Sequence, residues 1–320
     1  MYDPVILVAQ AGLAALLVTS GYLIAMSWES TASPLRFAWK RLLRVIPALV
    51  IAILVTLFVI GPLLTSLPPP GDYFAALLSP AALFTAPYFE DGSVIGLFQD
   101  NPWTYVNGSL WTIPVEVMMY GVVAALGIAG LLHRLGAIAV LAAVNILAWM
   151  YWFDDPPGWR RSGSPSTSSS GAFLYLHRHR IAYRPVVAGA LLLLLGFSAM
   201  TPYLTVAGVI AIPPYLTIYA AYLPIPYLST FGRAGDFSYG IYIYHYPVQQ
   251  ALIQVTTNTL LLPALFGLSF AVTFALAYLS WHAVEKRALA AKSLGADDLR
   301  RRLRLPSLPE SLTAWSIARK

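Results

Sequence analysis

The 320-residue chain contains no cysteine. Disulfides, thiolate metal sites and a cysteine nucleophile are therefore excluded. The five histidines are spread along the chain, so they do not indicate a metal site either. Charged residues are scarce as well, at 11% of the chain, whereas soluble proteins carry about 25%. The chain lacks the charged surface of an ordinary soluble protein.

Hydrophobic residues make up 58% of the chain and the mean hydropathy is +0.67, which indicates a membrane protein. A helix needs about 17–25 apolar residues to cross the hydrocarbon core of a bilayer. Eight segments have this character, although the fifth is short: residues 5–26, 45–65, 113–132, 137–153, 186–200, 204–223, 237–255 and 260–281. We predict an all-α, polytopic inner-membrane helical bundle, with about eight or nine spans.

Positive charge is concentrated in two places, although the net charge is only +6. Residues 286–320 hold nine Lys or Arg and three acids, and a second basic patch covers residues 36–44. Residues 67–110 contain acids but no Lys or Arg. The positive-inside rule then places both basic segments in the cytoplasm and residues 67–110 outside. This explains the charge without a nucleic-acid partner.

We predict one membrane domain over residues 1–285 and a basic cytoplasmic tail over residues 286–320. Within the domain, residues 154–170 are rich in serine and low in complexity, which predicts a disordered insertion. Alternation of the spans places residue 154 outside and the basic run 177–180 inside, yet residues 171–176 are too few to cross. Either a span is missing here or the segment forms a re-entrant turn.

Segment 237–255 carries polar side chains four, three and four residues apart, at Ser238, Tyr242, His245 and Gln249. This spacing places them on one face of a helix, which must turn toward protein or water rather than lipid. Pro247 lacks a backbone donor and clashes with the carbonyl of Ile243, so a kink is expected near His245. The stripe marks either a functional site or polar packing between helices.

Glu116 follows the run 107–115, which leads from the outer loop into a span. Its carboxylate could accept a proton or bind a sugar hydroxyl, or it could complement the positive N-terminus of its helix. Trp111, in the same run, could line a functional site, but it suits the belt of aromatic residues at a membrane interface equally well.

Arg41 and Arg44 lie three residues apart, on one helical face at the cytoplasmic mouth of a span. Guanidinium forks suit phosphate oxygens, in which acyl-CoA is rich. The alternative is an ordinary interfacial anchor.

Together these residues resemble the acyltransferase-3 family of integral membrane O-acyltransferases, over roughly residues 10–290. Six motifs match in order: Thr19-Ser20-Gly21-Tyr22-Leu23-Ile24, the Arg-x-x-Arg of Arg41 and Arg44 followed by Val45-Ile46-Pro47-Ala48-Leu49, Gly61-Pro62-Leu63-Leu64-Thr65, the run from Asn107 to Glu116, the run from Ser238 to Pro247, and Ser280-Trp281 with Val284-Glu285-Lys286.

The resemblance implies transfer of an acyl group, commonly acetyl, from cytoplasmic acyl-CoA to a hydroxyl of a surface polysaccharide or a lipid-linked sugar. It implies no tightly bound cofactor and no metal, and it places the protein among the lipids of a bacterial inner membrane. Arg41 and Arg44 would engage the CoA, and His245 and Glu116 are the catalytic candidates. Since a hydroxyl is a poor nucleophile at neutral pH, a base such as histidine is required. The predicted substrate-binding residues are Asn107, Ser109, Trp111, Ser238, Tyr239 and Tyr242.

The chain departs from the family pattern at two places. Family members usually begin with one more helix, which bears an arginine and then a histidine thought to be catalytic, whereas no histidine precedes His133 here. They also have a full span where the serine-rich run stands. The chain is therefore expected to be an acyltransferase or an incomplete, inactive copy of one. The alternatives are a catalytically silent protein that binds acyl-CoA or glycan, and a small-solute transporter.

Overall fold

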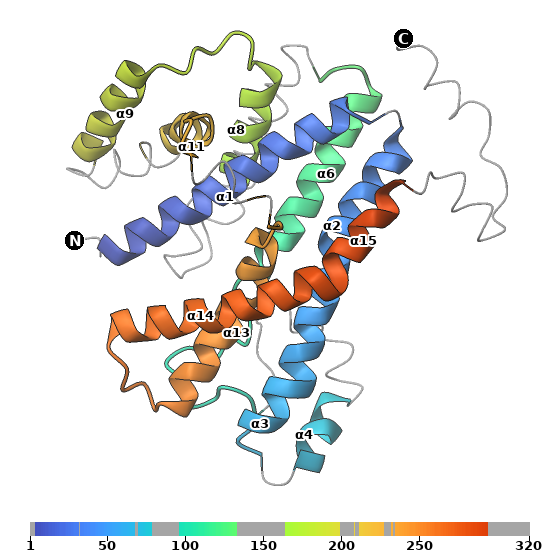
Figure 1. The fold of residues 1–320 in the computed structure, drawn as a ribbon, viewed down its shortest axis with the longest axis vertical. Coiled ribbons are helices and arrows are strands. Elements are labelled where there is room, and N and C mark those ends of the chain that lie inside the picture. The colour runs from blue at the N-terminus through green and yellow to red at the C-terminus, as the bar shows by residue number, and fades with distance from the viewer. Residues whose placement is uncertain are drawn as a thin grey trace, which may run out of the picture. The chain divides into compact units, whose positions relative to one another are not determined.

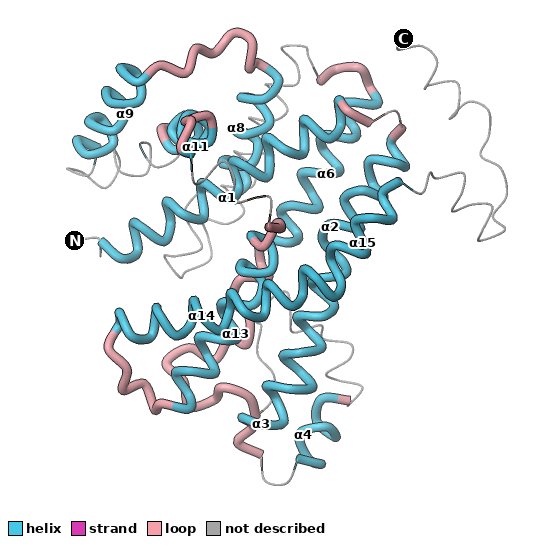
Figure 2. The backbone as a smooth tube through the Cα atoms, viewed as in Figure 1, coloured by secondary structure: helices cyan, strands magenta, loops and turns pink. Residues whose placement is uncertain are grey.

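The computed structural model describes residues 4–31, 33–67, 70–78, 96–132, 164–198, 211–226 and 234–293, with residues 208 and 232. Within these ranges the regular elements are helices (Figures 1 and 2), and one isolated β-bridge joins Thr65 and Leu97. The predicted all-α class is confirmed for this part of the chain. Contacts divide the chain into a first unit, Met1–Ala38, Ile113–Ile225 and Leu308–Lys320, and a second unit, Trp39–Thr112 and Pro226–Ser307.

Among the described residues, three helical segments are long and apolar enough to cross a membrane: Ala11–Glu29, Pro34–Leu64 and Leu262–Ala290. The first belongs to α1 (Pro4–Glu29), the second joins α2 (Pro34–Val55) to α3 (Gly61–Leu64), and the third joins α14 (Leu262–Ser280) to α15 (Lys286–Ala290). Two shorter apolar helices are α6 (Thr112–Ile128) and α9 (Pro185–Ser198). Eight or nine spans stay a prediction, because residues 137–153 lie outside the described ranges.

In the first unit, α1 packs closely against α8 (Ser164–Leu176) and also contacts α11 (Pro213–Ala221). The approach is close enough to require glycine on both helices. A Cβ at Gly21 would overlap the backbone carbonyl of Ser168, and one at Gly171 would overlap that of Val18. Small residues allow helices in membranes to approach in this way.

Helix α8 corrects part of the sequence-based interpretation. Composition predicts disorder for residues 154–170, whereas the structure places this segment in a helix from Ser164 onward, with Ser168 and Ser169 buried. Residues 154–163 lie outside the described ranges. The physical reason is that serine, like glycine, is small enough for a closely packed helix interface, so a serine-rich composition does not by itself indicate a solvated linker.

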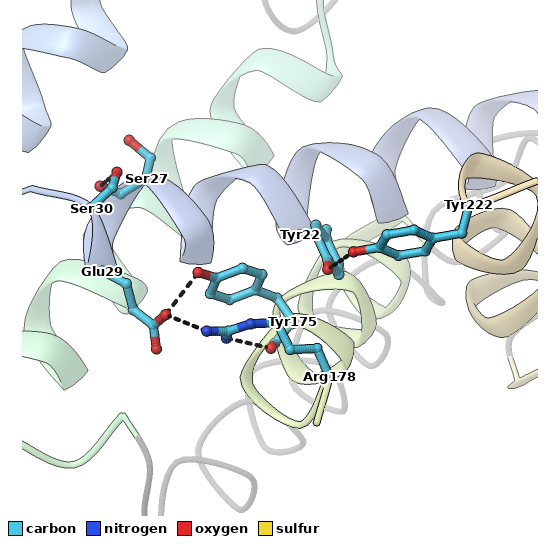
Figure 3. A network of polar contacts seen from close by, with 7 residues as sticks. All are labelled: Tyr22, Ser27, Glu29, Ser30, Tyr175, Arg178 and Tyr222. Atoms are coloured by element: carbon cyan, nitrogen blue, oxygen red, sulfur yellow. Dashed lines mark hydrogen bonds and ion pairs between the residues drawn. The ribbon is translucent and has the colours of Figure 1, made fainter. Parts of the chain in front are cut away.

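A polar network joins the helices of the first unit near the end of α1 (Figure 3). The Tyr175 hydroxyl donates to Glu29 Oε2 at 2.7 Å, and Arg178 Nη2 lies 3.1 Å from the same oxygen. The Arg178 guanidinium also stands 4.1 Å from the centroid of the Tyr175 ring. Earlier in α1, the hydroxyl of Tyr22 lies 2.7 Å from that of Tyr222. These contacts attach α8 and the end of α11 to α1.

In the second unit, α13 (Ser238–Val255) packs against α14 and α3. Gly240 permits the contact with α14, since a Cβ there would stand only 2.9 Å from the Cβ of Ala277. The core includes Ile243 and Tyr244 of α13 together with Ala48 and Ala52 of α2. This packing fixes the helix face from which the polar side chains of α13 project.

Candidate active site

The loop at residues 101–112 is joined to α13 at the point where Pro247 interrupts the backbone hydrogen bonds. Proline has no N–H, so the carbonyl of Ile243, four residues earlier, receives no bond from position 247. Asn107 Nδ2 donates to this carbonyl at 2.9 Å, and Asn107 is itself buried. The structure thus brings together two residues, Asn107 and Pro247, that the sequence places in separate motifs.

His245 lies beside this junction, and each of its two ring nitrogens has a polar neighbour. Its Nδ1 lies 2.7 Å from the backbone carbonyl of Tyr242. A carbonyl only accepts, so Nδ1 carries the proton and Nε2 of the neutral ring carries the lone pair. Ser109 Oγ lies 3.5 Å from Nε2. The arrangement is a basic nitrogen that faces a hydroxyl group.

Tyr242 holds the backbone on the other side of Ser109. Its hydroxyl donates to the carbonyl of Ser109 at 2.8 Å and lies 2.6 Å from Thr112 Oγ1. The backbone N–H of Ser109 donates to Asn107 Oδ1 at 3.1 Å. Asn107, Ser109, Tyr242 and His245, all predicted from the sequence, therefore meet in one site.

Two further residues that sequence reasoning missed fasten the same loop. Gln250 Nε2 donates to the carbonyls of Trp103 and Tyr105, each at 2.6 Å, and Asn101 Nδ2 donates to the carbonyl of Gln250 at 3.0 Å. The predicted stripe included Gln249, whereas the buried amide is the neighbouring Gln250. A buried amide must find partners in protein, but helical spacing alone did not show which of the two neighbouring glutamines is buried.

Arg44 forms a second cluster with residues just before and inside α13. Its Nη2 lies 2.7 Å from Asp236 Oδ2, and Ser238 Oγ donates to the other carboxylate oxygen at 2.6 Å. The guanidinium also lies 5.8 Å from the centroid of the Tyr239 ring, whose hydroxyl donates to the carbonyl of Val45 at 3.2 Å. Ser238 and Tyr239 therefore belong to the cluster around Arg44 and not to the one around His245.

Charge governs this cluster. Partial burial acts to raise the pKa of Asp236, but the Arg44 guanidinium and the hydrogen bonds from Ser238 and Arg44 outweigh it and hold the pKa below its ordinary value. The carboxylate therefore stays ionised beside Arg44 at neutral pH.

Lys292 adds positive charge to the same region. Trp39 Nε1 donates to the carbonyl of Ala291 at 3.2 Å, which attaches the short turn Ala291–Ser293 to α2. Burial, followed by the charges of Arg44, Arg41 and Lys40, lowers the pKa of Lys292. Cations that lower one another's proton affinity form a place that favours an anion. Sequence reasoning named neither Lys292 nor Asp236, because both lie far along the chain from Arg44.

Glu116 belongs to the first unit. Its Oε1 accepts hydrogen bonds from Ser20 Oγ, at 3.2 Å, and from the Tyr120 hydroxyl. Glu116 and His245 lie in different units, so neither unit contains both predicted catalytic residues. Trp111 is half-buried in the second unit, at the end of the loop before α6. In the described part of the chain, His, Asp and Glu form no group of three that could hold a metal ion.

Comparison with known proteins gives a consistent result. No solved structure matches the chain significantly. A curated relative, an O-acetyl transferase of Shigella phage Sf6, is 25% identical over an alignment of 283 residues that covers 86% of this chain and 83% of the relative. The acyltransferase-3 family model, described as an acyltransferase domain, matches residues 2–282. With this match over most of its length, the chain belongs to the acyltransferase-3 family.

Proposed function

We propose that this protein is a membrane O-acyltransferase that moves an acyl group, most simply acetyl, from acyl-CoA to a hydroxyl of a cell-surface glycan or a lipid-linked sugar. The observation that carries the proposal is His245, whose Nε2 lone pair faces a hydroxyl. Family membership supports the reaction class, and the relative's name, O-acetyl transferase, supports transfer of acetyl to oxygen.

The chemistry requires one base. The lone pair of His245 Nε2 takes the proton of the acceptor hydroxyl while the oxygen attacks the thioester carbonyl carbon. The carbon–sulfur bond then breaks, and the imidazolium returns its proton to the departing CoA sulfur. Ser109 Oγ marks a position from which a hydroxyl reaches this nitrogen. The bond from Nδ1 to the carbonyl of Tyr242 keeps the ring in the tautomer that the reaction needs.

The donor would bind through its phosphates at the cluster of Arg41, Arg44 and Lys292. Arginine forks match phosphate oxygens in a bidentate manner, and the lysine adds a point charge. Arg44 is held by Asp236 in the structure. A phosphate would therefore replace the carboxylate as the partner of the guanidinium.

We also propose that the protein lies in a bacterial inner membrane with the start of α2 and the C-terminal tail in the cytoplasm. The bond from Trp39 to the carbonyl of Ala291 supports this, because it joins the basic patch at residues 36–44 to the beginning of the tail. Both segments then lie on one side of the membrane, as the positive-inside rule requires. Tail residues 294–320 lie outside the described ranges.

The test is transfer of radiolabelled acetyl from acetyl-CoA to envelope glycan in membranes that contain the protein, together with CoA binding to the detergent-purified protein. Wild type should transfer label, and R41K/R44K should bind CoA about tenfold more weakly because lysine lacks the fork. R287K, which changes an exposed arginine of α15, is the matched control and should bind CoA as wild type does.

Two results would contradict the proposal in different ways. CoA binding without label transfer would indicate a silent binding protein or an inactive copy. Absence of both binding and transfer in folded protein would leave the transporter alternative.

A further inference from the structure

The backbone carbonyl of Ile243 lacks its usual helix donor, because Pro247 stands four residues later. Pro247 cannot donate to it, and water does not readily replace the missing bond inside the protein. The carbonyl belongs to a residue that is 0% exposed. Its donor is instead the side-chain amide of Asn107, from a loop more than a hundred residues earlier in the chain.

The amide of Asn107 makes two bonds that only one orientation allows. Nδ2 donates to the Ile243 carbonyl at 2.9 Å, while Oδ1 accepts from the backbone N–H of Ser109 at 3.1 Å. Reversing the amide would place an oxygen against a carbonyl and a donor against a donor. The side chain therefore links α13 directly to the backbone of Ser109.

We propose that Asn107 is a positioning residue. By closing the carbonyl that Pro247 leaves open, it fixes Ser109, and the acceptor hydroxyl that binds there, opposite Nε2 of His245. This inference rests on the proposed function for the hydroxyl acceptor, but the link between Asn107, Pro247 and His245 can be tested without it.

The loop offers a matched control in Asn101. This residue also donates its amide to a carbonyl of α13, that of Gln250, at 3.0 Å. Four residues later stands Gln254, which unlike proline has a backbone N–H to donate. Asn101 therefore attaches the loop to a carbonyl that has a helix donor of its own, whereas Asn107 attaches it to one that has none.

The experiment is a double-mutant cycle on the full-length protein in detergent. The readout is the rate at which diethyl pyrocarbonate modifies His245, followed by peptide mass spectrometry. N107A removes the link, and P247A supplies a backbone N–H that replaces it. Each variant should release Ser109 from Nε2 and speed the modification by about tenfold, and N107A/P247A should be no faster than either alone, because coupled residues are not additive. The effects of N101A and P247A on the modification rate should instead multiply in the N101A/P247A double variant.

Transfer of labelled acetyl supplies a second readout. N107A should lower kcat per folded molecule by about ten- to a hundredfold, because misplacement of a reacting group costs rate, with the KM for acetyl-CoA unchanged. A merely structural role would lower the amount of folded protein and leave kcat of the folded fraction unchanged. If N107A fails to fold, N107A/P247A should fold, since position 247 then donates to the open carbonyl.

Three results would overturn the inference: independent multiplication of N107A and P247A, unchanged reactivity of His245 in folded N107A, or failure of N107A to fold in both backgrounds. Lack of transfer by wild type would count against the proposed function alone. The modification rates would still decide whether Asn107 positions Ser109 at His245.

Discussion

Two polar clusters, one in each unit, differ in how completely their polar groups are paired. In the first unit, Glu29 receives both a phenol and a guanidinium, so its charge is balanced within the network (Figure 3). In the second unit, His245 gives one nitrogen to the backbone and leaves the other in a 3.5 Å contact with Ser109. The first arrangement satisfies its charges and fastens helices. The second leaves a basic lone pair facing a hydroxyl group.

The largest expected effect tests this difference at His245. H245Q retains a side chain that forms hydrogen bonds but removes the base, so acetyl transfer should fall by about 10²–10⁴. The temperature of unfolding in detergent should change little, because the glutamine amide retains both a donor and an acceptor for the polar contacts of His245. Transfer by H245Q at the wild-type rate would mean that another group is the base.

Much of the second site could be predicted from the sequence because its residues lie in short, regular patterns. The spacing of Tyr242 and His245 defines a helix face, and Arg41 and Arg44 repeat at helical spacing. Which loop atoms meet that face could not be predicted. The bond between Asn107 and Ile243 joins residues 136 positions apart, and helical periodicity carries no information at that separation.

The first unit shows the opposite limit of sequence reasoning. Serine and glycine in residues 164–171 have the composition of a linker, and the same small size also lets α8 lie against α1. Composition alone does not distinguish these outcomes. The partner surface on α1, with Gly21 and Val18, decides between them, and it stands about 150 residues earlier.

A smaller effect is expected from breaking the closed network. E29Q keeps an acceptor for Tyr175 but loses the ion pair with Arg178. The side chains of Glu29 and Arg178 are both partly exposed. Unfolding in detergent should become easier by about 1–2 kcal/mol, since a charged hydrogen bond is lost where water only partly replaces it. Acetyl transfer per folded molecule should stay at the wild-type level.

The control for E29Q lies one residue away. Ser30 Oγ donates to the carbonyl of Ser27 at 3.1 Å, in the turn that follows the end of α1. S30A therefore removes a local bond and should leave stability almost unchanged. Equal losses in S30A and E29Q would show that fraying of the helix end, rather than the network, limits stability.

The smallest effect concerns the basic cluster, and it appears only at alkaline pH. Burial and the neighbouring charges of Arg44, Arg41 and Lys40 lower the pKa of Lys292 below its ordinary value. As pH rises from about 8 to about 10, Lys292 therefore loses its proton earlier than a free lysine does, and its attraction for phosphate goes with it. CoA affinity of wild type should fall by about threefold over this range, the size of one partly exposed charge pair.

K292R should hold its affinity, because a guanidinium keeps its charge. K286R, which changes an exposed lysine of α15, should follow the wild-type curve. The measurement is titration calorimetry with CoA itself, which has no thioester to hydrolyse. A flat wild-type curve would show that Lys292 does not face the donor and that Arg41 and Arg44 bind it alone.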